Sequence, residues 1–120
     1  MPTTTQALRY SEFGDPMETL ALDTIHLDQP ENDEVGIRIL SAPINPADFG
    51  RINGSYGTLA DLPATGGLEG VGEIVSRGKN ATRFQIGSRV IFSGDPGSWQ
   101  TLANIPESHV HPAPMSLNNE

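Results

Sequence analysis

The sequence predicts a mainly β protein, an antiparallel sandwich or barrel with very little helix. Apolar and polar residues alternate with a period of two in several short segments, which is the pattern of strands that bury one face. Turn-forming residues separate these segments, and only one stretch carries the start signals of a helix. The segments with strand periodicity are 6–13, 19–27, 34–44, 70–78, 89–94 and 98–105.

The first three predicted strands follow one another closely. Gly14-Asp15-Pro16 separates the first from the second, and the run 29–33, which contains Pro30, separates the second from the third. Both stretches are rich in the residues that favour turns. Three short strands therefore open the chain.

One short helix is predicted directly after the third strand. Asn45 is a suitable N-cap, Pro46 suits the first helical position, and Asp48 stands three residues after the cap as in a capping box. These signals predict a helix over 46–52. Tyr56 follows it on a loop that is rich in glycine and serine.

A glycine cluster precedes the fourth predicted strand. Gly67, Gly70 and Gly72 do not have the G-x-G-x-x-G spacing, and a strand-like segment follows them instead of a helix. We interpret the cluster as close packing of backbones in a barrel. Glu69, within the cluster, is either a strand carboxylate with satisfied hydrogen bonds or a buried polar group near a site.

Composition limits the possible partners. The length of 120 residues indicates one domain, and 15 acidic against 7 basic residues give a net charge of −8, which repels nucleic acid and anionic lipid. The absence of cysteine excludes disulfides, zinc-thiolate sites and iron–sulfur clusters. With no long apolar run and no secretory start, we expect a cytoplasmic protein without a membrane partner.

Few side chains suggest chemistry on their own. His109 and His111 would share one strand face, but two imidazoles without a third ligand make a weak metal site, so we expect no metal. The phenol of Tyr56 would keep its proton at neutral pH, which suits a hydrogen-bond donor or general acid, although tyrosines often simply pack over turns. The amide of Asn45 either caps the helix or reaches a ligand.

Three stretches together resemble a known family. Residues 44–57 (INPADFGRINGSYG), 62–92 and 97–114 (GSWQTLANIPESHVHPAP) are similar to the catalytic, GroES-like domain of the medium-chain dehydrogenase/reductase superfamily. Within it, the resemblance is strongest to zinc-free 2-enoyl thioester reductases of the mitochondrial enoyl-CoA reductase type. It implies a partly open antiparallel GroES-like β-barrel with one or two short helices over residues 1–120.

The resemblance also implies a chemistry without zinc. Zinc-dependent members of the superfamily have a Cys just after the third strand and a His before the Glu of the glycine cluster. This sequence has Asn45 and Leu68 at those places. Another group must then manage the proton and the developing negative charge.

In the reductases that the resemblance implies, NADPH delivers hydride to the β-carbon of a trans-2-enoyl thioester, a reaction of fatty acid metabolism. It assigns the proton donor to Tyr56 and the orientation of cofactor or substrate to Asn45. Trp99 would lie near the interdomain cleft as a substrate contact, or would serve packing. The full-length members are usually homodimers.

The resemblance carries one further expectation about the domains. Members of the family continue into a Rossmann domain that binds most of the cofactor, and the 120 residues contain no such domain. We therefore expect the isolated chain to be inactive. Two alternatives stay open: a zinc-free domain of the quinone oxidoreductase type, and a non-enzymatic, stand-alone GroES-like binding module.

Overall fold

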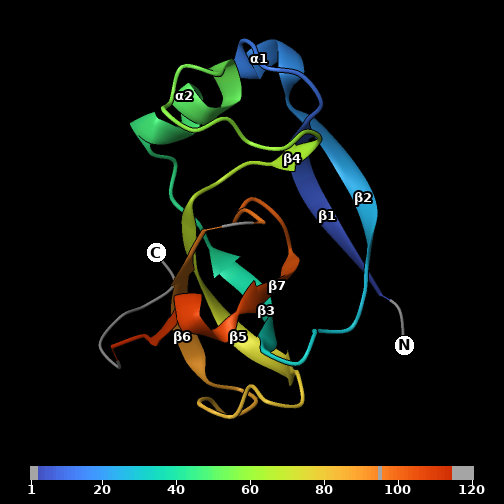
Figure 1. Cartoon of the computed structure of the whole chain (residues 1–120), viewed down its shortest axis with the longest axis vertical. Coiled ribbons are helices and arrows are strands. Elements are labelled where there is room, and N and C mark those ends of the chain that lie inside the picture. Colours follow the sequence, from blue (N-terminus) through green and yellow to red (C-terminus); the bar gives the residue numbers. More distant parts are fainter. Residues whose placement is uncertain (1–2, 95, 115–120) are drawn as a thin grey trace.

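The computed structural model describes residues 3–94 and 96–114, which form two antiparallel sheets and two short α-helices. The three-stranded sheet has the order β2-β1-β4 and the five-stranded sheet the order β7-β3-β5-β6-β8. Figure 1 shows the β1–β2 ribbon along one side of the molecule and both helices together at one end. The bounds are β1 Thr3–Tyr10, α1 Pro16–Thr19, β2 Ala21–Leu27, β3 Glu34–Ser41, α2 Pro46–Asn53, β4 Ala64–Thr65, β5 Glu69–Arg77, β6 Arg89–Ser93, β7 Leu102–Pro106 and β8 Val110–Pro112, with a 3₁₀ turn at Glu107–His109.

The predicted fold class is confirmed: the molecule is mainly β, antiparallel and only partly closed. All six predicted strands are present, with shifted ends. The last one begins later than predicted, because residues 98–101 form an irregular connection along β1. There the Leu8 N–H donates to the Trp99 carbonyl at 2.9 Å, and the Thr101 N–H donates to the Gln6 carbonyl at 3.0 Å.

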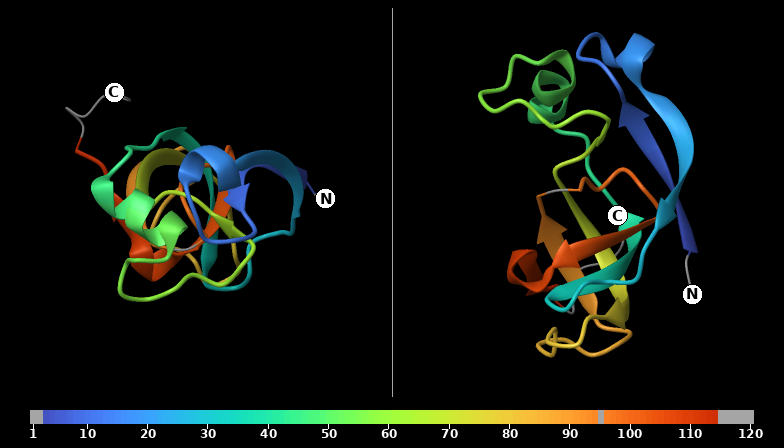
Figure 2. Two further views of the ribbon diagram at one scale, coloured as in Figure 1. Left: turned by 90° about the horizontal axis from the view of Figure 1, so that it is seen from above. Right: turned by 45° about the vertical axis from the view of Figure 1, so that its right-hand side comes forward.

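Helix α2 has the predicted position and start. The Asn45 backbone N–H donates to the Asp48 carboxylate at 2.6 Å, which is one half of a capping box. The helix ends at Gly54, whose φ of 83° lies in the left-handed region that favours glycine. Figure 2 shows α2 beside α1, above the end of the five-stranded sheet.

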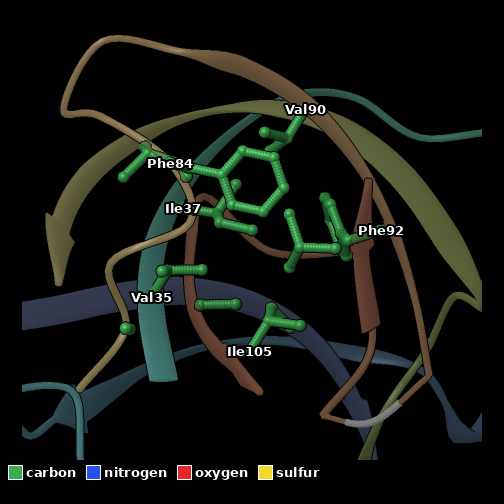
Figure 3. Close-up of a cluster of buried hydrophobic side chains, with 10 residues drawn as sticks. Val35, Ile37, Phe84, Val90, Phe92 and Ile105 are labelled. Carbon is green, nitrogen blue, oxygen red and sulfur yellow. The ribbon is translucent and has the colours of Figure 1, made fainter. Parts of the chain in front are cut away.

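The hydrophobic core lies within the five-stranded sheet, away from the helices. Alternate residues of β3, β5, β6 and β7 are buried together. Figure 3 shows Val35, Ile37, Val90, Phe92 and Ile105 gathered around the ring of Phe84. The buried cluster consists of Val35, Ile37, Ile74, Ala81, Phe84, Val90, Phe92, Ala103, Ile105 and Val110. None of these residues belongs to α2, so this helix lies outside the buried cluster.

The glycine cluster packs closely, as the sequence suggested. A Cβ on Gly72 would lie 2.3 Å from Cγ2 of Ile37 and 2.6 Å from the Arg38 carbonyl oxygen, so no larger residue fits without movement. A Cβ on Gly70 would lie 2.9 Å from the ring of Phe92. These glycines allow β5 to approach β3 and the core closely.

Candidate functional site

The site begins at Asn45, where β3 leads into α2. Asn45 is half-buried, and its backbone N–H is already bound by Asp48. The Asp48 side chain is only 2% exposed. Its second oxygen, Oδ1, is buried and accepts no hydrogen bond from the residues that the structure describes. The carboxylate therefore fixes the first turn of the helix from the inside, while the side chain of Asn45 stands at the helix entrance.

Asp48→Ala is expected to lower the free energy of unfolding by about 1–2 kcal/mol, because the Asn45 N–H loses its charged acceptor. Urea unfolding measures this change. The control is Asp23→Ala on exposed β2, which should change stability by less than about 0.5 kcal/mol. Equal effects of the two substitutions would show that the capping bond contributes nothing.

Tyr56 lies on the loop after α2 with a fixed main chain and an accessible side chain. The Ser55 and Tyr56 N–H groups both donate to the Gly50 carbonyl, at 3.0 and 3.1 Å. The Ser55 N–H also donates to Oδ1 of Asn53 at 2.9 Å. The side chain of Tyr56 is 50% exposed. The main chain that carries the phenol is thus held in place, and the side chain remains open to a ligand.

The cavity beside Tyr56 has a volume of about 520 Å³. Arg51, from the last turn of α2, lines it together with Leu68 before β5 and Gly94 after β6. The sequence reasoning missed Arg51. The only signal in the sequence is its place five residues before Tyr56. The cavity itself forms where the loop meets Leu68 and Gly94, which lie far from Arg51 in the sequence.

Trp99 lies on another side of the helix end. Its indole Nε1–H donates to the Pro43 carbonyl at 3.2 Å, and the ring packs against Gly66 and Gly67. It lines a mostly apolar groove of about 500 Å³ with Ile44 and Phe49. Asn45 therefore lies just before the first residue of α2, and Tyr56 lies three residues after its last. Trp99 contacts the segment that precedes the helix, at Pro43.

Glu69 and the two C-terminal histidines do not form a metal centre. Glu69 is exposed at the start of β5, so the alternative of a buried polar group is wrong. His109 ends the 3₁₀ turn and His111 lies in β8, so the expectation that they share one strand face is also wrong: strand alternation does not extend through a turn. Within residues 3–94 and 96–114, no three His, Asp or Glu side chains gather as metal ligands would.

Residues 31–115 match the alcohol dehydrogenase GroES-like domain. The chain belongs to this family. It is 37% identical over 117 residues to the mitochondrial enoyl-[acyl-carrier-protein] reductase of Mus musculus, an alignment that covers 97% of this chain and 31% of that protein. The chain thus spans about a third of the length of the curated relatives that it matches.

Two solved structures show the same relationship for the GroES-like domain. The quinone oxidoreductase of Pseudomonas syringae is 26% identical with a TM-score of 0.86, over 96% of this chain and 35% of that one. The Etr1p mutant solved with NADP and crotonyl-CoA is 27% identical with a TM-score of 0.80, over 95% of this chain and 34% of that one. The relatives of this GroES-like domain are therefore oxidoreductases.

The relatives correct the predicted location. The expectation of a cytoplasmic protein is wrong, because the mouse relative and others like it are mitochondrial by name. That expectation rested on a missing secretory start and on missing apolar runs, and neither observation distinguishes the cytoplasm from the mitochondrion.

Across the described part of the GroES-like domain, no helix has the length and apolar character needed to cross a membrane.

Proposed function

We propose that this chain is the substrate-side domain of a zinc-independent, NADPH-dependent trans-2-enoyl thioester reductase. The observation that carries the proposal is the phenol of Tyr56, fixed at its main chain by Gly50 and half-exposed beside a cavity of about 520 Å³. The identity of 37% to a mitochondrial enoyl-[acyl-carrier-protein] reductase supports the thioester as substrate.

The reaction needs an acid because reduction creates a carbanion. A bound NADPH would supply a hydride, which forms the new C–H bond at the β-carbon of the enoyl group. The electron pair of the C=C bond then moves toward the α-carbon and the thioester oxygen. Tyr56 donates its proton to the α-carbon, and water returns a proton to the phenolate. The thioester bond itself stays intact.

Asn45 has the second role in this proposal. It stands at the entrance of α2, and the buried Asp48 holds its backbone in place. From there its side-chain amide orients the cofactor or the substrate. Asn45 and Leu68 stand where zinc-dependent members have Cys and His, and an aliphatic side chain offers a metal no ligand atom, which supports a mechanism without zinc.

In this proposal, the 120 residues contain only part of the active site. A nicotinamide-binding domain of the Rossmann type would supply most of the cofactor site, and the full-length protein would be a homodimer. The 120-residue chain alone would be inactive. The acyl substrate is a small-molecule thioester, as in the Etr1p mutant solved with NADP and crotonyl-CoA.

A second candidate is reduction of quinones. The TM-score of 0.86 to a quinone oxidoreductase favours it. Quinone oxygens take protons readily from water, so this reaction places less demand on Tyr56 than protonation of carbon does. A non-enzymatic binding module would be a third candidate, but a half-exposed phenol beside a cavity has no evident purpose in such a module.

The test follows NADPH consumption by this chain alone and by a two-domain protein that joins it to a nicotinamide-binding domain. We expect turnover only in the two-domain protein, and faster with crotonyl-CoA than with a benzoquinone. A preference for the quinone would favour the second candidate. No oxidation of NADPH with either substrate, by a two-domain protein that binds NADPH, would exclude both enzymatic proposals.

A further inference from the structure

Trp99 holds the main chain at the entrance to the site. Its indole Nε1–H donates to the carbonyl of Pro43, two residues before Asn45. Proline fixes its own φ and restricts the residue before it to extended conformations, so Pro43 and Pro46 make this connection stiff. Asn45 has the extended geometry expected before Pro46, with φ −109° and ψ 154°. A hydrogen bond at Pro43 therefore sets the direction in which the chain enters α2.

Trp99 is held at its main chain as well as at its ring. The Trp99 backbone N–H donates to the Gly66 carbonyl at 2.9 Å, and the Trp99 carbonyl accepts from the Leu8 backbone N–H at 2.9 Å. The Gly66 N–H donates to the Leu8 carbonyl at 3.0 Å, which closes the set. A Cβ on Gly66 would lie 2.4 Å from Cε3 of the indole, so the ring fills the space that a larger residue would need. Both the backbone and the ring of Trp99 are thus fixed.

Helix α2 connects the segment at Pro43 to Tyr56. Helix α2 begins at Pro46, and the Gly50 carbonyl in its middle accepts from the Tyr56 N–H at 3.1 Å. Because the hydrogen-bonded turns of α2 connect its entrance to Gly50, we expect a change at the entrance to move Asn45 and Tyr56 together. Trp99 itself lines the apolar groove, whereas Tyr56 lines a different cavity.

We infer that Trp99 is a positioning residue whose indole N–H, through the Pro43 carbonyl, sets the places of Asn45 and Tyr56. The expected effect of this role on turnover rests on the function proposed above. This role differs from the substrate contact that the family resemblance implied for Trp99. A positioning role predicts a loss of turnover with little change in substrate binding, whereas a substrate contact predicts the reverse.

The first test uses the 120-residue chain, in which Trp99 is the only tryptophan and gives a single indole N–H resonance. Trp99→Phe keeps an aromatic ring and removes the donor. Gly66→Ala keeps Trp99 and displaces its ring. With either variant, we expect the side-chain amide resonances of Asn45 and the backbone amide resonance of Tyr56 to shift.

The control is Asn104→Leu in the middle of β7. It removes a similar side-chain bond, from Asn104 Nδ2–H to the Asp28 carbonyl at 2.8 Å. The Asn45 and Tyr56 resonances should stay in place in this variant. Unchanged resonances in both Trp99→Phe and Gly66→Ala would overturn the inference.

The second test measures kinetics with crotonyl-CoA in the two-domain protein. In Trp99→Phe we expect kcat to fall about tenfold, since small misplacements of reacting groups are costly, while KM stays within about twofold. A raised KM with unchanged kcat would overturn the inference and restore the substrate contact. If the unsubstituted protein reduces no enoyl thioester, the proposed function fails, and the resonance shifts alone decide the role of Trp99.

Discussion

Tyr56→Phe is expected to lower kcat for a crotonyl thioester by about 100-fold in the two-domain protein. Phenylalanine keeps the ring and removes only the hydroxyl that would protonate the α-carbon. Because the side chain is 50% exposed and its main-chain bonds to Gly50 are unaffected, stability should hardly change. Steady-state kinetics would show the loss in kcat with KM almost constant, the pattern of an interaction made in the transition state.

The other tyrosine provides the control for this prediction. Tyr10 is the other of the two tyrosines in the chain and is 1% exposed at the end of β1. Tyr10→Phe removes the same hydroxyl outside the cavity and should leave kcat within about twofold. If Tyr56→Phe turned over at the original rate, Tyr56 would not be the acid, and the carbanion would take its proton from water or from another group.

Ile37→Ala is expected to lower the free energy of unfolding by about 3 kcal/mol. Ile37 is fully buried in the middle of β3, opposite Ala103 of β7 and Ile74 of β5. Truncation removes buried methyl groups and leaves a cavity, which Gly72 beside it cannot fill because it has no side chain. Urea unfolding of the 120-residue chain would measure the difference.

An exposed leucine gives the matched comparison. Leu22 is 68% exposed on β2, and Leu22→Ala removes a side chain of similar size from a surface position. Its effect should stay below about 0.5 kcal/mol. Similar losses in the two variants would mean that the cluster of the five-stranded sheet is not the main source of stability.

The sequence predicts the long elements of this fold well and the short ones poorly. Period-two alternation needs several residues to be recognised, so β1, β3 and β5 were predictable and the two residues of β4 were not. The sequence predicts a turn where α1 lies, because Asp15-Pro16 suits both a turn and a helix start, and four residues are too few for helical periodicity. Helix α2 was predictable because its N-cap and first turn carry explicit signals.

The site shows the same division between local and distant information. The loop position of Tyr56 follows from its neighbours in sequence. The bond from Trp99 to Pro43 joins residues 56 positions apart, and no local pattern encodes it. The cavity lined by Arg51, Leu68 and Gly94 likewise exists only once three segments of the chain have met.

The separation of α2 from the buried cluster bears on how such a domain can change over evolutionary time. Of its residues, only Asp48 and Ile52 are buried, and neither belongs to the core of the five-stranded sheet. Apart from Gly50 and Gly54, which are closely packed, the exposed positions of the helix can therefore change at little cost to folding. If the proposed function holds, substrate preference could change at these positions while the five-stranded sheet stays the same.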